Sequence, residues 1–494
     1  MNQSRRTFLR DSAVCLAVGV LAVATSRGAA RKGFAQSHDR PNVLLILTDD
    51  QGYHDLSCQG AEDFATPHID ALAASGVRFT AGYVTAPQCG PSRAGLLTGM
   101  HQSRFGCTDN NNDFGLPPAD VVQVLPEQLK SLGYTTGMVG KWHVGFLEDE
   151  QDGHATRPGH HPWERGFDYV LKHHGGMSHF FPYRDDGWKW MTDRKREPRL
   201  RRKLEQEATP TYLEDLPEDT YLTDIFSDDA ADFIKRHGDD AAPWFLFLSY
   251  NAPHTPIMAP KDKMDKYAHI EDGRRRTLAA MMDSLDDGVG KVLDALQETG
   301  QRDNTLVWFL SDNGAVQLDA HNWNGSRNDP FSGAKGDVVE GGIRVPFMVS
   351  WPGTIPEGQV VDNPVISLDI LPTSLAAAGG PEADPIHDGN NLLPWLKGEA
   401  ECPNDVLYWT WRRNFNAVRV GDLKEIRNGK PVTAIDGTEI PAHNFVDLAS
   451  NPAELAGEHA LQSAEKRQML SRKLDAWLQT VREDAQKLTP GSGS

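Results

Sequence analysis

Cysteine is scarce in this chain, and so is positive charge. Only 5 of the 494 residues are cysteines, which is too few for a disulfide-stabilised scaffold, and their spacing matches no zinc-binding pattern. Lysine and arginine together number 50 against 69 acidic residues, which gives a formal net charge of -19. This surplus of negative charge argues against nucleic acid or an anionic membrane surface as a main partner. It does not exclude an anionic substrate, since a local group of cations can dominate the field inside a buried site.

Apolar runs long enough to cross a bilayer are also missing. The run at residues 13–24 is shorter than the about 20 residues of an ordinary membrane span. Paired arginines precede Phe8-Leu9 just before this run, an order that resembles a twin-arginine export signal. We therefore predict that residues 1–38 are an export signal with a flexible segment. The mature protein would then be periplasmic or secreted, with no membrane contact; an uncleaved membrane anchor is the alternative.

Three apolar runs end abruptly in polar side chains, at residues 43–52, 244–254 and 305–314. Continuous runs of Val, Leu, Ile and Phe are typical of strands that are buried on both faces of a parallel sheet. Such sheets bind their ligands beyond the carboxyl ends of the strands. We therefore expect the polar residues that follow the three strands to lie close together.

Helical periodicity fills the intervals between these strands, at residues 66–75, 125–132, 221–237 and 274–299. The alternation predicts an α/β fold with a large, mixed and mainly parallel sheet sandwiched by helices. Residues 151–217 show weak periodicity and are rich in His, Trp, Arg and Asp. We predict that they form long loops over the site.

Short alternating runs replace this pattern after residue 398, and an amphipathic helix is predicted at residues 464–488. We expect a smaller C-terminal antiparallel sheet with one helix. The predicted organisation is therefore an export segment, a large catalytic domain at residues 39–398, an α+β subdomain at residues 399–488 and a flexible tail at residues 489–494.

One short segment carries a specific motif. Residues 89–99 read CGPSRAGLLTG, and this order of Cys, Pro, Ser-Arg and Thr-Gly resembles the signature of the type I, formylglycine-dependent sulfatases of the alkaline phosphatase superfamily, which include arylsulfatases and N-acetylgalactosamine sulfatases. The resemblance implies a sulfuric ester hydrolase in which a formylglycine-generating enzyme oxidises Cys89 to formylglycine, whose hydrated aldehyde supplies the nucleophilic hydroxyl. A structural cysteine buried at a helix start is the alternative. Once Cys89 is modified, at most one disulfide can form among Cys58, Cys107 and Cys402, and its pairing is open.

Hard oxygen ligands follow two of the predicted strands. Asp49-Asp50 come after the first apolar run and Asp312-Asn313 after the third. Their side chains suit Ca²⁺ or Mg²⁺ better than zinc. The resemblance places a divalent cation, commonly calcium, on these four positions beside the modified Cys89. A bare pair of aspartates would otherwise be a solvated loop or a helix cap.

Cationic residues are expected around the same point. Three further segments match the family, with the sequences GKWH, NAPH and GAKG at residues 140–143, 251–254 and 333–336. The resemblance implies that Arg93 and Lys141 bind the formylglycine hydrate or its neighbours, while Lys141, His254 and Lys335 hold the sulfate oxygens. His143 is the expected base. His254, supported by Lys335, is the expected proton donor to the leaving group, because imidazole titrates near neutral pH.

Aromatic and polar residues of the predicted loops favour a sulfated carbohydrate as the substrate, because aromatic rings stack on sugar faces and polar groups bind hydroxyls. Besides Lys141, His254 and Lys335, the predicted substrate-binding residues are His173, His174, His321 and Arg327, and further candidates for the rim are Trp163, His179, Trp188, Trp190, Asn322 and Trp323. The sugar, the position of its sulfate, exo or endo action and the oligomeric state stay open.

Two other functions fit the sequence. A formylglycine-dependent phosphodiesterase or phosphonate monoester hydrolase of the same superfamily would use a similar site, although a single predicted metal with no added His/Asp cluster favours the sulfatase. An exported carbohydrate-binding relative that leaves Cys89 unmodified is the second. Turnover of sulfate against phosphate esters, together with the mass of the Cys89 peptide, distinguishes these possibilities.

Overall fold

The computed structural model describes residues 40–110, 115–147, 155–173, 175–193, 199–213, 216–316, 324–381, 384–412 and 414–488. These residues belong to one compact unit. The predicted export signal and the predicted C-terminal tail lie outside the described residues, and the division into domains at residue 398 stays a prediction. Among the described helices, none has the length and the apolar character that a membrane span requires.

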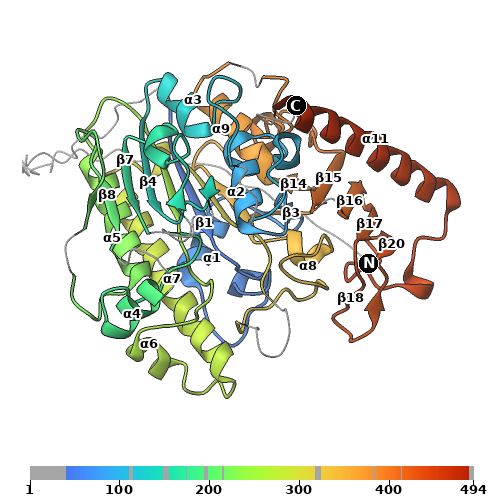
Figure 1. Cartoon of the computed structure of the whole chain (residues 1–494), viewed down its shortest axis with the longest axis horizontal. Coiled ribbons are helices and arrows are strands. Elements are labelled where there is room, and N and C mark those ends of the chain that lie inside the picture. Colours follow the sequence, from blue (N-terminus) through green and yellow to red (C-terminus); the bar gives the residue numbers. More distant parts are fainter. Residues whose placement is uncertain are drawn as a thin grey trace, which may run out of the picture. The chain divides into compact units, whose positions relative to one another are not determined.

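A ten-stranded sheet forms the centre of the fold (Figure 1). Its strands, in spatial order, are β13 (Gln359–Val361), β2 (Val77–Phe79), β12 (Phe347–Ser350), β11 (Thr305–Ser311), β1 (Asn42–Thr48), β10 (Trp244–Ser249), β4 (Thr135–Gly140), β7 (Tyr169–Lys172), β8 (Arg201–Lys203) and β9 (Thr211–Tyr212). The five strands from β11 to β7 run parallel, whereas β12 and β8 pair antiparallel on either side of them. The predicted mixed, mainly parallel sheet is therefore confirmed.

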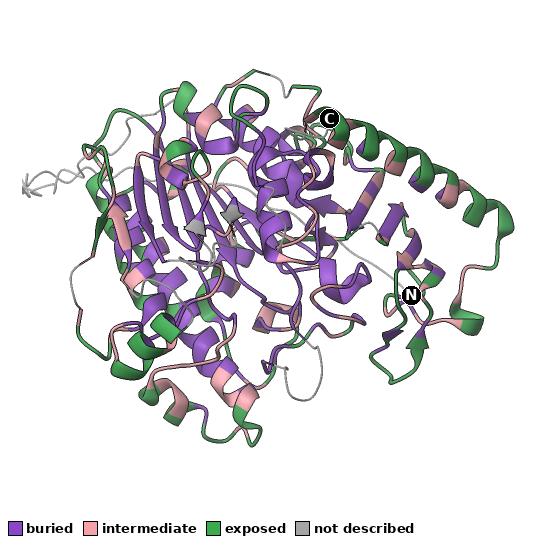
Figure 2. Cartoon of the chain, in the orientation of Figure 1, coloured by how far each residue is buried: buried purple, intermediate pink, exposed green. Residues whose placement is uncertain are grey.

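Helices cover both faces of this sheet. Side chains of β1 alternate between two cores: Leu45 faces a core completed by α2 (Cys89–Thr98), α3 (Leu125–Ser131) and α9 (Ile370–Ala377). Its neighbour Ile46 faces the opposite core, completed by α1 (Pro67–Ala74), α5 (Leu222–Arg236) and α7 (Gly273–Glu298). Burial on both faces explains why these strands are uninterrupted apolar runs (Figure 2). The four predicted helices are confirmed to within one residue at each end.

A four-stranded antiparallel sheet with one helix forms the C-terminal part. Its strands, in order, are β15 (Val406–Trp411), β16 (Phe415–Val420), β17 (Leu423–Asn428) and β20 (His443–Asp447), and its helix is α11 (Ala464–Leu488). Leu470 and Leu474 of α11 pack against Val418 of β16, as the amphipathic pattern predicts. The indole Nε1 of Trp409 donates to the Val84 carbonyl at 2.7 Å, which joins this sheet to the central part.

Shorter elements complete the described chain. They are β3 (Gly82–Tyr83), β5 (Phe146–Leu147), β6 (Ala155–Thr156), β14 (Val365–Ile366), β18 (Val432–Thr433), β19 (Glu439–Ile440), α4 (Asp185–Asp193), α6 (Lys261–Lys266), α8 (Glu340–Ile343) and α10 (Leu393–Leu396), with 3₁₀ turns at Ser57–Gln59, Gln102–Phe105, Pro162–Glu164, Arg302–Asn304, Ser367–Asp369 and Gly457–His459.

The prediction of long loops throughout residues 151–217 is wrong in part. The segment contains β7 and β8 of the central sheet, and the side chains of Tyr169, Val170 and Leu171 are buried in its two cores. A four-residue strand is too short to give a periodic signal, and β8 has the sequence Arg-Arg-Lys. Pairing with neighbouring strands, rather than local propensity, fixes both strands.

Candidate active site

Three parallel strands deliver polar residues to one edge of the central sheet. Beyond β1 lie Asp49 and Asp50, beyond β11 lies Asp312, and beyond β4 lies Lys141. Backbone hydrogen bonds continue past the strand ends, from Asp49 N to Ala252 O (3.1 Å), from Asp312 N to Thr48 O (3.0 Å) and from Lys141 N to Ser249 O (2.7 Å). These bonds hold the catalytic candidates in register with the sheet. The expected convergence of the strand ends therefore occurs.

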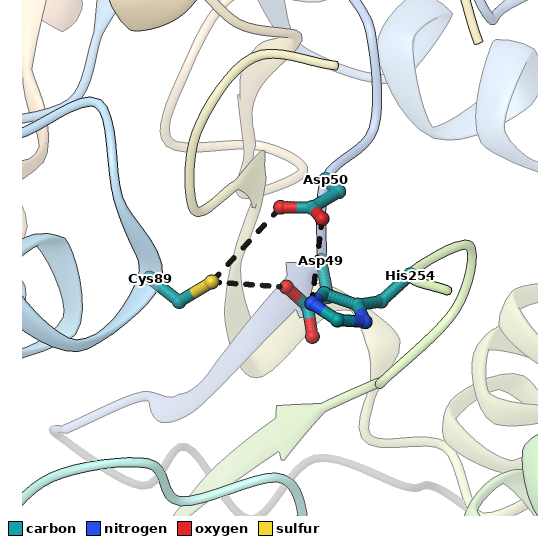
Figure 3. A group of neighbouring side chains, drawn as sticks. All are labelled: Asp49, Asp50, Cys89 and His254. Carbon is teal, nitrogen blue, oxygen red and sulfur yellow. Dashed lines mark hydrogen bonds and ion pairs between the residues drawn. The ribbon is translucent and has the colours of Figure 1, made fainter. Parts of the chain in front are cut away.

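Cys89 is the first residue of α2 and is completely buried beside these carboxylates. Its Sγ lies 3.6 Å from Asp49 Oδ1 and 3.9 Å from Asp50 Oδ1 (Figure 3). The same sulfur lies 3.0 Å from Lys335 Nζ. Burial opposes ionisation of the thiol, but the ammonium groups of Lys141 and Lys335 outweigh it and lower the pKa of Cys89 to about 7. The thiol is thus held in a field that stabilises an anion.

The carboxylates keep oxygen atoms available for a cation. Asn313 Nδ2 donates to Asp50 Oδ1 at 2.7 Å, which holds the Asn313 side chain beside that carboxylate. Within the described residues, Asn313 Oδ1 and Asp50 Oδ2 are buried without a hydrogen bond, and Asp50 Oδ2 has only an ion-pair contact with His254 at 3.4 Å. Ligand atoms of Asp49, Asp50, Cys89 and His254 all lie within 4.8 Å of one another. Buried, unsatisfied oxygens on Asp and Asn side chains fit a hard divalent cation.

Positive side chains balance these carboxylates. Arg93 binds Asp312 Oδ2 through Nε and Nη2, both at 2.8 Å, and Lys141 Nζ lies 2.5 Å from Asp49 Oδ2. Lys335 Nζ lies 2.6 Å from Asp50 Oδ1. Burial alone would raise the pKa of the Asp50 carboxyl, but the charges of Lys335, His254 and Lys141 together outweigh burial and hold that pKa well below its usual range.

The two histidines are in opposite electrostatic environments. Burial would lower the pKa of His254, but the carboxylates of Asp49 and Asp50 outweigh it and raise that pKa above its usual value. For His143, burial and the charge of Lys141 act together and hold the pKa well below the usual value. The pKa values of the two imidazoles are therefore shifted in opposite directions, which is the condition for acid and base roles in one site.

Ser249 belongs to this group although the sequence analysis did not single it out. Arg93 Nη1 donates to Ser249 Oγ at 2.6 Å, and the last residue of β10 is Ser249. Its position at the end of an apolar run was the available signal, because polar residues at such strand ends face the same edge.

The predicted substrate-binding residues outside this group differ in their exposure. The structure places His173 in the interior, where its ring stacks on Phe226 at 6.3 Å between centroids, so it is not an exposed rim residue. Arg327 is exposed. His174 and His321 lie outside the described residues, as do Asn322 and Trp323. Of the other rim candidates, Trp188 is exposed, Trp163 and Trp190 are half-buried and His179 is buried.

The cysteines of the described chain form no disulfide. Cys58, Cys107 and Cys402 are free thiols, as is Cys89.

Comparison with known proteins identifies the family. A family model described as Sulfatase matches residues 41–380, and a second, described as N-sulphoglucosamine sulphohydrolase, C-terminal, matches residues 335–484. The chain belongs to the sulfatase family. This sulfatase is 33% identical over 470 residues to N-acetylgalactosamine-6-sulfatase of Homo sapiens, in an alignment that covers 87% of this chain and 84% of the relative. It is a sulfuric ester hydrolase, and the predicted reaction class is confirmed.

Solved sulfatase structures share the fold of this sulfatase. The structure of Ps i-CgsB in complex with k-i-k-neocarrahexaose has a TM-score of 0.75 and 30% identity, covering 90% of this chain and 94% of that chain. The PsFucS1 sulfatase from Pseudoalteromonas sp. has a TM-score of 0.75 and 26% identity, covering 91% of each chain.

Proposed function

We propose that this sulfatase is exported and removes sulfate from a sulfated carbohydrate, using Cys89 matured to formylglycine and one divalent cation. The observation that carries the proposal is the position of the Cys89 sulfur, 3.0 Å from Lys335 Nζ and within 4 Å of two aspartate side chains. A nucleophile needs to lie beside both the cation and the charges that stabilise the sulfate.

The cation and the modified residue supply distinct chemistry. Asp49, Asp50, Asp312 and Asn313 would hold the cation, and their oxygen donors fit calcium. The cation would neutralise charge on a sulfate oxygen. Formylglycine provides a hydroxyl from its hydrated aldehyde as the nucleophile.

The other side chains of the site bind the sulfate group, transfer protons or orient the metal ligands. Lys141 and Lys335, which contact Asp49 and Asp50, are placed to bind sulfate oxygens as charge-assisted donors. His254, with its raised pKa, carries the proton for the leaving group, and His143, with its lowered pKa, accepts one. Arg93 holds Asp312 and, through Ser249, the end of β10, so it orients the ligands rather than the substrate.

Two comparisons favour a carbohydrate. The relative named N-acetylgalactosamine-6-sulfatase and the neighbour Ps i-CgsB, solved in complex with k-i-k-neocarrahexaose, both have names or titles that refer to sugars. The predicted twin-arginine signal adds support, because export would bring the enzyme to extracellular polysaccharides.

The proposal is tested by a screen of defined sulfated saccharides and aryl sulfates. Phosphate esters are the comparison substrates. We expect release of sulfate from at least one saccharide, with sulfate esters preferred over phosphate esters. In the protein purified from its native host, the Cys89 peptide should be lighter by about 18 Da, the mass change of conversion to formylglycine. An unmodified thiol with undiminished turnover would contradict the formylglycine role, and turnover of aryl sulfates alone would contradict the carbohydrate substrate.

A further inference from the structure

Lys172, at the carboxyl end of β7, is a buried cation that the site described above does not use. Its side chain is 3% exposed. Among the described residues, none forms an ion pair with its ammonium group or accepts a hydrogen bond from it; its one favourable polar contact is with the ring of Trp163, whose centroid lies 5.9 Å from Nζ. A cation–π contact stabilises by about 0.5–2 kcal/mol, which is less than the cost of burying an unpaired ammonium group.

A second cation faces Lys172 directly. Arg201 of β8 is its partner in the antiparallel register, so the two side chains lie on the same face of the sheet. Like charges opposite each other on paired strands destabilise a sheet. Arg201 donates through Nη2 to Tyr212 Oη at 3.0 Å, but its Nε is buried without a partner in the described part of the chain. The charge of Arg201, after burial itself, lowers the pKa of Lys172 to about 7.

His161 adds a third nitrogen. Its ring stacks on Trp163 at 4.4 Å between centroids, and its Nδ1 is buried with no hydrogen bond to any described residue. The acidic side chain of Glu164, whose charge acts on His161, accepts from the backbone N–H groups of Gly159 and His161. We call His161, Lys172 and Arg201 the cationic cluster. Lys172 and Arg201 are its cations, whereas burial and the charge of Lys172 lower the pKa of His161 to about 4, so its imidazole contributes a neutral nitrogen. His161 and Arg201 are half-buried, so the cluster reaches the surface.

The cationic cluster adjoins the candidate active site. Lys172 is in register with Gly140 of β4, the residue before Lys141. The chain that leaves β7 lies against His143, since a Cβ added to Gly176 would be 2.4 Å from His143 Nε2. Neighbouring strands are about 4.8 Å apart, so a substrate held at Lys141 has further parts within reach of the cluster.

We propose that the cationic cluster binds a second anionic group of the saccharide, a sulfate or carboxylate other than the one that is hydrolysed. This inference rests on the proposed carbohydrate substrate and specifies it as a polyanionic saccharide. An anion between Lys172 and Arg201 would relieve their repulsion and accept charge-assisted hydrogen bonds from Lys172 Nζ and from Arg201 Nε, which has no partner among the described residues.

The test compares a disulfated disaccharide with the disaccharide that carries only the hydrolysed sulfate. The measured quantity is kcat/KM for the disulfated disaccharide divided by kcat/KM for the monosulfated one. We expect Lys172→Met and Arg201→Gln each to lower this ratio by about tenfold or more, the effect of losing one charge-assisted hydrogen bond. Arg202→Gln is the matched control, since Arg202 is the next residue, points to the other face and pairs with Asp229 at 2.8 Å. Its ratio should match that of the wild type.

Thermal unfolding shows whether each variant is still folded. Without ligand, Lys172→Met should unfold at the same temperature as the wild type or higher, because an apolar side chain replaces an unpaired buried cation. An unchanged kcat/KM ratio in folded Lys172→Met and Arg201→Gln would overturn the inference. If inorganic phosphate raises the Tm of the wild type more than that of Lys172→Met while the ratio is unchanged, the cluster binds a free anion, which overturns its role toward substrate. Wild-type turnover of aryl sulfates but of neither disaccharide would instead contradict the proposed carbohydrate substrate.

Discussion

The ammonium nitrogen of Lys335 lies 3.0 Å from the sulfur of Cys89, at the first residue of α2. The two residues are 246 positions apart in the chain, and the contact exists because the segment around Lys335 is held to the segment before Cys89 by a bond from Gly336 N to Pro87 O at 2.8 Å. A cation fixed against the sulfur stabilises negative charge there, whether on a thiolate or on an oxygen that replaces it.

Removing that cation should raise the pKa of the thiol. In metal-free protein that retains Cys89, the midpoint of thiolate formation should lie near pH 7 in the wild type and shift upward in Lys335→Met, because a charge that favours the anion is lost. The thiolate is followed by its ultraviolet absorbance against Cys89→Ser. Lys430→Met, which removes an exposed lysine, is the control. An unchanged midpoint in Lys335→Met would show that the contact has no electrostatic effect.

Loss of a carboxylate at the end of β11 should remove the cation and the activity together. We expect Asp312→Asn to lower kcat about a thousandfold or more and to reduce the bound divalent metal, measured by elemental analysis of the purified protein. Asp303→Asn, an exposed aspartate just before the amino end of the same strand, should change neither. Full metal content in Asp312→Asn would exclude Asp312 as a ligand.

The sequence predicted the parts of this molecule that local patterns encode. Apolar runs with polar ends gave β1, β10 and β11, and helical periodicity gave the helices between them, because these elements are long and buried. Asp49 and Asp312 were found because each follows such a run. The strand β7 was missed because four residues carry no periodicity, and its pairing depends on a neighbour that is distant in sequence.

Side-chain pairs between distant segments were equally inaccessible. Nothing near Lys172 in the sequence indicates that Arg201 lies opposite, and nothing near Lys424 indicates two buried glutamates. The register of a sheet and the docking of one sheet on another decide such contacts, and a single sequence contains no direct signal for either.

Lys424 should be a major contributor to stability. Its Nζ lies 2.7 Å from Glu340 Oε1 and 2.7 Å from Glu454 Oε1, and all three side chains are completely buried. Lys424→Met would remove the cation that pairs with buried Glu454 and leave Glu340 paired with Arg344 at 3.0 Å, so the free energy of unfolding should fall by about 3–5 kcal/mol. Lys430 lies in the loop that follows β17. The free energy of unfolding of Lys430→Met should stay within about 0.5 kcal/mol of the wild-type value. Denaturant unfolding measures both, and equal values for the two variants would contradict this role.

The same cluster should make stability depend on pH through Glu454. Burial and the neighbouring carboxylate of Glu340 outweigh Lys424 and raise the pKa of Glu454 to about 7. A carboxyl whose pKa is raised on folding stabilises the fold below its ordinary pKa, and this contribution is lost as the pH rises through about 7. Burial raises the pKa of Glu340, but Lys424, Arg344 and Arg419 together outweigh burial and lower that pKa to about 2. Glu340 therefore loses its contribution to stability only in acid and stays ionised throughout this range.

Stability should therefore decrease between about pH 5 and about pH 8 in the wild type, and the decrease should be smaller in Glu454→Gln by on the order of 2–3 kcal/mol. The slope should not vanish, because burial also raises the pKa of Asp369 to about 6 and adds a change of the same sign. Glu458→Gln, which alters an exposed side chain four residues away, should keep the wild-type slope. The free energy of unfolding is measured at both pH values. If it changes by the same amount in Glu454→Gln as in the wild type, Glu454 is ionised across the range and Lys424 must neutralise both carboxylates.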